Sequence, residues 1–134
     1  METLRPWMRN LLRFAGCYNL LVGVNLTVFY HEMFKALGLP KPALVMYVQL
    51  VGVLVALFGV GYLLVASNPL QNRNLLLLGF LSKLFGSIIG TYHIILGTMP
   101  PIFIVILFFS DIIYLPFFWL ILRRVYRQAA ERAL

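Results

Sequence analysis

The chain has 134 residues, of which 62% are hydrophobic and only 11% are charged, and its formal net charge is +7. Soluble domains average about 45–50% apolar and about 25% charged residues, so this composition is typical of a membrane protein and excludes an ordinary soluble domain. The single cysteine excludes an intrachain disulfide. Because Cys17 lies within an apolar run, we expect its thiol to be buried as a small hydrophobic group.

Four apolar runs are long enough to cross a bilayer, whose hydrocarbon core of roughly 30 Å requires about 20 helical residues. They cover about residues 11–31, 44–66, 74–97 and 101–123. The connections contain helix-breaking residues, in "LGLPKPA", "SNPLQNRN" and "GTMPP". The sequence therefore predicts an all-α polytopic membrane protein, a single domain built as an antiparallel four-transmembrane-helix bundle. The basic tail, residues 124–134, is expected to continue the last helix.

The basic residues predict the orientation of the bundle. In a four-span topology, the two termini and the second loop lie on one side, and these regions hold eight arginines. The opposite side has only Lys35 and Lys41. By the positive-inside rule, both termini are predicted to be cytoplasmic. The arginines are Arg5, Arg9, Arg13, Arg73, Arg123, Arg124, Arg127 and Arg132.

The positive charge of the chain flanks its apolar segments, which favours lipid headgroups over nucleic acid as the binding partner. The clearest case is the end of the fourth span, where Arg123, Arg124 and Arg127 follow the apolar run. Each arginine near an anionic membrane surface contributes about 1 kcal/mol to membrane binding. We expect these three side chains to contact headgroups.

Small residues recur on one face of several spans. Lipid tails are as apolar as leucine, so helices in a bilayer associate through close packing of such residues. We therefore expect these faces to be helix contacts rather than ligand sites. The glycines concerned are Gly16 and Gly23 in the first span, Gly52 and Gly59 in the second, and Gly79, Gly86 and Gly90 in the third.

The fourth span contains Pro116, which has no N–H to donate and whose ring clashes with the carbonyl of Ile112. A kink is therefore expected there.

Two charged side chains, Lys83 and Asp111, fall well inside the spans. At about 1.5 Å per residue they lie roughly 13 and 18 Å from the cytoplasmic ends of the third and fourth helices. A charge at this depth costs at least about 2.5–3.5 kcal/mol, so we expect the two to pair across the short turn between these helices. Three roles stay open: a structural register lock, a polar site for a proton or ligand, or a Lys83 side chain that snorkels to the surface.

Two histidines, His31 and His93, fall near the outer ends of their spans, where a pair of imidazoles could bind haem or a metal. No third ligand accompanies them, so the metal signal is weak. Interfacial placement beside Tyr30 and Tyr92 is the simpler interpretation.

Three further polar residues, Asn19, Ser87 and Tyr114, are candidate ligand contacts inside the bundle. The sequence shows no nucleophile–base–orienter set, and we assign no catalytic residue. It also identifies no cofactor, so an enzyme is the less favoured interpretation.

The segments "LLGFLSKLFGSIIGTYHIILG" and "FFSDIIYLPFFWLILRRVYR" resemble the DoxX-like group of small four-helix bacterial membrane proteins. The resemblance covers roughly the C-terminal half and implies a four-helix bundle in the bacterial inner membrane, with a redox or accessory role. It supplies no catalytic residues. The matching positions are Lys83, Gly86, Asp111, Pro116 and Phe117.

Three functions are consistent with these observations. The leading hypothesis is a non-enzymatic subunit or accessory protein of a larger membrane complex, in contact with lipids and with other subunits or a second copy of itself. The second is a small oligomeric transporter or channel that uses Lys83 and Asp111. The third is a membrane redox protein that binds quinone, haem or pigment between helices, near His93 or Tyr114. Small multidrug transporters also have four spans, but they need an acidic residue in the first span, which this chain lacks.

Overall fold

A computed structural model describes residues 3–134, which fold into helices without any strand. Four segments are long and apolar enough to cross a membrane: α1, α3, α4 and the continuous run Phe103–Ala133. The chain is therefore an all-α polytopic membrane protein, as predicted. The elements are α1 (Pro6–Val28), α2 (Tyr30–Ala36), α3 (Val45–Ser67), α4 (Arg73–Ile95), α5 (Phe103–Leu107), the π-helical turn η1 (Phe108–Ile112) and α6 (Tyr114–Ala133).

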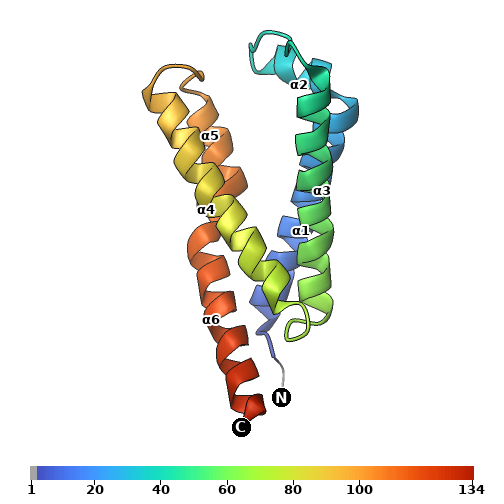
Figure 1. Cartoon of the computed structure of the whole chain (residues 1–134), viewed down its shortest axis with the longest axis vertical. Helices are drawn as coiled ribbons and strands as arrows, with labels where there is room; N and C mark the ends of the chain where they lie inside the picture. Colours follow the sequence, from blue (N-terminus) through green and yellow to red (C-terminus); the bar gives the residue numbers. More distant parts are fainter. Residues whose placement is uncertain (1–2) are drawn as a thin grey trace.

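The helices form two arms that meet at one end of the molecule (Figure 1). In the first arm α1 packs along α3, with α2 at its tip; in the second arm α4 packs along α5, η1 and α6. The arms converge at the end that holds both chain termini, here called the closed end, and separate at the end that holds α2, here called the open end. We had expected a bundle that is compact along its whole length, but the helices pack together at the closed end only.

The apolar core lies at the closed end. It combines the start of α1, the end of α3, the start of α4 and the first part of α6, so that all four spans contribute. Burial of these side chains joins the arms there, and the open end has no comparable core among the described residues. The fully buried members with the largest side chains are Leu4, Leu12, Tyr62, Val65, Leu76, Phe118, Ile121 and Val125.

The first arm is held together by glycines that bring two backbones into contact. A Cβ added at Gly23 would lie 2.5 Å from the carbonyl oxygen of Gly52, and one added at Gly59 would lie 2.6 Å from that of Gly16. Real Cβ atoms do not approach oxygen so closely, so only glycine permits this helix spacing. Close approach of this kind is the main source of helix association in lipid.

The first span differs from its expected range of residues 11–31. Pro6 starts α1 five residues earlier, since proline is well tolerated in the first helical turn. The helix ends at Val28, and a separate short helix, α2, follows Phe29. The side chains of Asn25 and Thr27 each bond the carbonyl four residues before them, which bends helices and favours a break.

The expectation of a buried thiol at Cys17 is wrong, because this residue is exposed. Helix α1 turns Gly16 and Gly23 toward α3, and the helical rotation then places Cys17 on the outer face of the arm.

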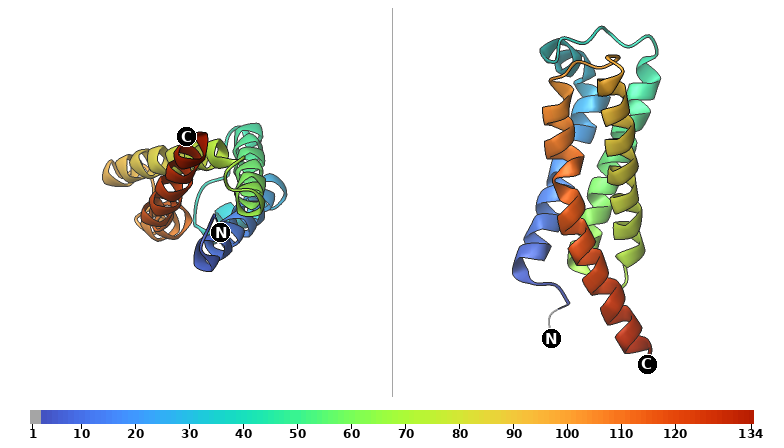
Figure 2. Two further views of the ribbon diagram at one scale, coloured as in Figure 1. Left: turned by 90° about the horizontal axis from the view of Figure 1, so that it is seen from below. Right: turned by 90° about the vertical axis from the view of Figure 1, so that its left-hand side faces the viewer.

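The fourth span bends where the structure inserts the π-helical turn η1, one turn before Pro116 (Figure 2). At the end of η1 the backbone N–H of Ile113 donates to the carbonyl of Phe108 at 2.9 Å, five residues earlier. Such wide turns change the helix direction and are common at functional sites. The predicted kink is thus present, but its form is a π turn.

Alanine substitution of two glycines in α3 tests the backbone contact of the first arm. Gly59→Ala should lower the free energy of unfolding by about 1–3 kcal/mol, because the added methyl group overlaps the carbonyl of Gly16. The matched control is Gly61→Ala, whose methyl group meets nothing within 4 Å. Thermal unfolding in mild detergent measures both. Equal effects of the two variants would contradict this account of the arm.

Candidate functional site

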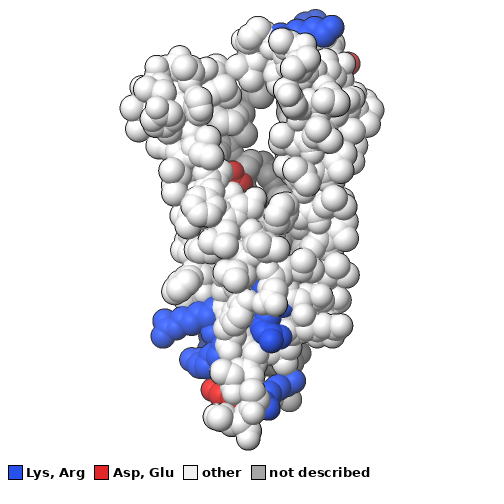
Figure 3. Space-filling model, viewed as in Figure 1, with Lys and Arg blue, Asp and Glu red and all other residues white. Residues whose placement is uncertain are grey.

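A cavity of about 690 Å³ lies between the two arms. This volume falls within the range of roughly 300–1,000 Å³ that is usual for small-molecule sites. Both arms line it, and acidic atoms are visible within the opening in Figure 3. Most of its wall is apolar, and the residues with polar side-chain groups that line it are Tyr18, Asn19, Tyr62, Ser82, Lys83, Ser110 and Asp111.

The structure brings Lys83 and Asp111 together at mid-depth. The Nζ atom of Lys83 lies 3.4 Å from Oδ1 of Asp111 and donates to the carbonyl oxygen of Ser110 at 2.7 Å. Ser110 belongs to the π-helical turn η1, so the irregular backbone of this turn supplies a partner for the lysine. The ammonium is thus bonded on the second arm and does not snorkel to the surface.

Three aromatic rings enclose the ammonium of Lys83. Its Nζ lies 4.7 Å from the ring centroid of Tyr114, 5.6 Å from that of Tyr62 and 6.0 Å from that of Phe118. Ring faces attract cations within about 6 Å, and the attraction is strongest where water is excluded. These three rings, called the aromatic cage below, complete the surroundings of the charge.

The two charged side chains differ in their access to the cavity. Only 4% of the Lys83 side chain is exposed, against 26% of the Asp111 side chain. Gly86 lines the cavity instead of making the close helix contact expected of it. A Cβ at this position would meet only Oδ2 of Asp111, at 3.4 Å, so the glycine leaves space beside the carboxylate. Both side chains line the cavity, but the carboxylate is the more exposed of the two.

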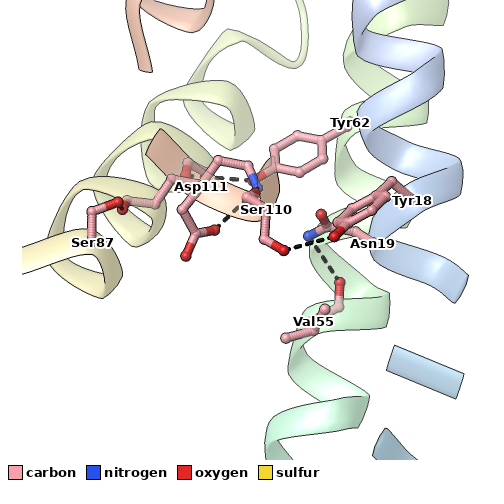
Figure 4. Close-up of polar contacts among 9 residues, drawn as sticks. Tyr18, Asn19, Val55, Tyr62, Ser87, Ser110 and Asp111 are labelled. Atoms are coloured by element: carbon pink, nitrogen blue, oxygen red, sulfur yellow. Dashed lines mark hydrogen bonds and ion pairs between the residues drawn. The ribbon is translucent and has the colours of Figure 1, made fainter. Parts of the chain in front are cut away.

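A second group of polar contacts lies at the same depth, one between the two arms and one within the first arm. The hydroxyl of Tyr18 in α1 lies 2.7 Å from the hydroxyl of Ser110 (Figure 4). Beside it, Nδ2 of Asn19 donates to the carbonyl of Val55 in α3 at 3.3 Å. These groups form the polar floor of the cavity with Asp111.

Of the five ligand contacts expected from the sequence, only Asn19 lines this cavity. Ser87 is buried and donates to the carbonyl of Lys83 at 2.6 Å, so its hydroxyl is used within α4. Tyr114 is also buried, as part of the aromatic cage.

The two histidines are not brought together. His31 is exposed on α2 in the first arm, and His93 is exposed at the end of α4 in the second arm. Nδ1 of His93 lies 2.7 Å from the hydroxyl of Thr98. Within residues 3–134 no group of three or more metal-ligating side chains occurs. Both positions fit the interfacial interpretation.

The tail arginines divide into two kinds. Arg123 and Arg127 are exposed at the closed end, where basic atoms gather in Figure 3. Arg124 is partly buried, and its Nε donates to the carbonyl of Thr3 at 2.7 Å, so this residue also ties the N-terminal segment to α6. A similar contact joins Arg9 to the carbonyl of Ala66 at 3.1 Å.

No protein-family model, curated protein or solved structure matches the chain. Its function is therefore inferred from the geometry of the site.

The aromatic cage was not predicted, although part of its signal is in the sequence. Tyr114 and Phe118 follow Asp111 by three and seven residues, which places all three on one helical face. Tyr62 comes from a different arm, and nothing in its local sequence indicates that its ring lies near Lys83.

Removal of the charges tests whether Lys83 and Asp111 act as a pair. Each single alanine variant leaves one charge without its partner, and this costs roughly 3–5 kcal/mol at buried sites. The double variant should lose less free energy of unfolding than the sum of the losses in the two single variants. It should also be better folded than either single variant. Thermal unfolding in mild detergent gives the coupling energy. A double variant no more stable than the singles would contradict the pairing.

Proposed function

We propose that this protein is a non-enzymatic integral membrane protein that binds one amphipathic small molecule between its two arms. The observation that carries the proposal is the cavity of about 690 Å³, whose apolar walls end at a polar floor formed by Tyr18, Asn19, Ser110 and Asp111. Large apolar pockets with a few convergent polar groups are the usual form of small-molecule sites.

The form of the cavity supports an amphipathic ligand. Its walls carry side chains such as Leu26, Val55, Ile106 and Leu107, which favour a hydrocarbon body. The polar groups lie at one depth, at the inner end of the cavity, so they favour a ligand with its polar group at one end. The membrane itself is a source of molecules with this character.

This proposal refines the hypotheses that the sequence left open. The site favours a lipid-like or quinone-like ligand over haem, since His31 and His93 lie on different arms. The resemblance to DoxX-like proteins, at Lys83, Gly86 and Asp111, supports the further proposal that the protein serves as an accessory subunit of a larger bacterial membrane complex.

We also propose that the closed end faces the cytoplasm, because its arginines outnumber the two lysines of the open end. The test starts from a Cys17→Ser background in a bacterial host and adds either Lys41→Cys or Ala130→Cys, both at exposed positions. A membrane-impermeant maleimide should label the first variant in intact cells and the second only after lysis. The reverse pattern would overturn the orientation.

Mild-detergent purification from the native membrane, followed by mass spectrometry of the extracted small molecules, tests ligand binding. We expect one amphipathic compound to copurify with the wild-type chain. Val55→Phe should reduce its amount by about tenfold, equivalent to about 1.4 kcal/mol, because the larger side chain fills the cavity.

The matched control is Val53→Phe on the same helix, because Val53 is exposed outside the cavity. It should retain the compound at the wild-type level. If no compound copurifies, or if both variants retain it equally, the cavity is not the binding site.

A further inference from the structure

We infer that the cavity selects an uncharged head group that donates a hydrogen bond, namely a hydroxyl, and that Asp111 is the residue that receives it. This inference rests on the proposed function, which supplies the amphipathic ligand, and adds the chemistry of its polar end.

The ammonium of Lys83 is not available to a ligand, because its own neighbours in the protein already surround it. An ammonium has three N–H donors. One points to the carbonyl of Ser110 at 2.7 Å and one to Asp111 at 3.4 Å. The aromatic cage covers the remaining side, with the ring of Tyr114 nearest. A carboxylate or phosphate head group would therefore find no free cation in the cavity.

The carboxylate of Asp111 is available to a ligand through one of its two oxygens. Oδ1 faces Lys83, while Oδ2 lies beside the open position of Gly86. A carboxylate accepts hydrogen bonds and donates none. A ligand atom that reaches Oδ2 must therefore carry a hydrogen to donate, and hydrogen bonds to charged groups are the stronger class.

The net charge of the cavity wall disfavours a charged head group. Lys83 and Asp111 are the two charged residues that line the cavity, and their charges cancel. An ammonium head group would leave one uncompensated positive charge in an apolar site, which is costly. An anionic head group would in addition approach the carboxylate directly. A hydroxyl avoids both penalties.

The ligand class is thus a hydroxyl on a hydrophobic body, and two membrane sources have this chemistry. One is an aliphatic alcohol, such as a long-chain or isoprenoid alcohol; the other is a phenol, such as a quinol. The polar floor serves either, because the hydroxyls of Tyr18 and Ser110 border the same space and can donate or accept.

Competition binding in lipid nanodiscs that contain the full chain tests this selectivity. The probe is a photo-crosslinkable long-chain alcohol, and labelled peptides are identified by mass spectrometry. The competitors share one alkyl chain: hexadecanol, its methyl ether, hexadecylamine and hexadecanoate. We expect hexadecanol to compete best and the ether, which cannot donate, to be about tenfold weaker. Decylhydroquinone and decylbenzoquinone form a second set of competitors, which distinguishes a phenolic from an aliphatic source.

The outcomes separate this inference from the proposed function. If the probe labels no residue of the cavity, ligand binding in the cavity is wrong, and the inference fails with it. If the cavity is labelled but the ether, amine or carboxylate competes as well as hexadecanol, the cavity binds a ligand and the head-group inference alone is overturned. Stronger competition by hydroquinone than by benzoquinone supports the phenolic source.

Three variants test whether the hydroxyl of the ligand binds to Asp111. Gly86→Leu should block the space beside Oδ2 and abolish the preference for hexadecanol over its ether, while the Lys83 contact stays in place. Phe85→Leu is the matched control, because Phe85 is exposed outside the cavity. Asp111→Asn should reduce the preference in the same way. An unchanged preference in folded Gly86→Leu protein would overturn the assignment.

Discussion

The burial of the Lys83 ammonium is the constraint on which much of this structure depends. A cation at this depth needs partners in place of water, because unpaired charge in hydrocarbon is strongly unfavourable. The protein supplies a carboxylate, a backbone carbonyl and three aromatic rings. Each of these partners requires a specific feature of the surrounding helices.

Two features of the helices follow from that requirement, the π-helical turn η1 and the glycine at position 79. The carbonyl that accepts from Lys83 belongs to Ser110, within the π-helical turn η1, and Pro116 lies just beyond this turn. Gly79 has a related role, since a side chain there would occupy the position of the Tyr62 ring, whose hydroxyl donates to the carbonyl of Gly79 at 3.4 Å. Gly79 thus makes room for an aromatic ring of the cage, whereas Gly59 brings two backbones into contact.

The same organisation explains why a cavity exists. Each arm is closely packed along its own length, the first through glycine contacts and the second around Lys83 and Asp111. Between the arms, the large apolar core lies at the closed end, and the contact of Tyr18 with Ser110 marks the depth at which the arms separate. The ion pair therefore lies at the boundary between a packed core and an open space, which makes one of its members accessible.

The sequence alone determined the four spans, the helical tail and the depths of Lys83 and Asp111, because hydrophobic length and helical rise are local properties. It also located Pro116 as a point of irregularity. The tertiary structure decided the π turn, the exposed position of Cys17, the separation of the histidines and the contribution of Tyr62 to the cage. It also decided that Asp111 is the more exposed of the two charged residues in the cavity wall. These features depend on which helical face meets which neighbour, and that is fixed by packing between segments far apart in the chain.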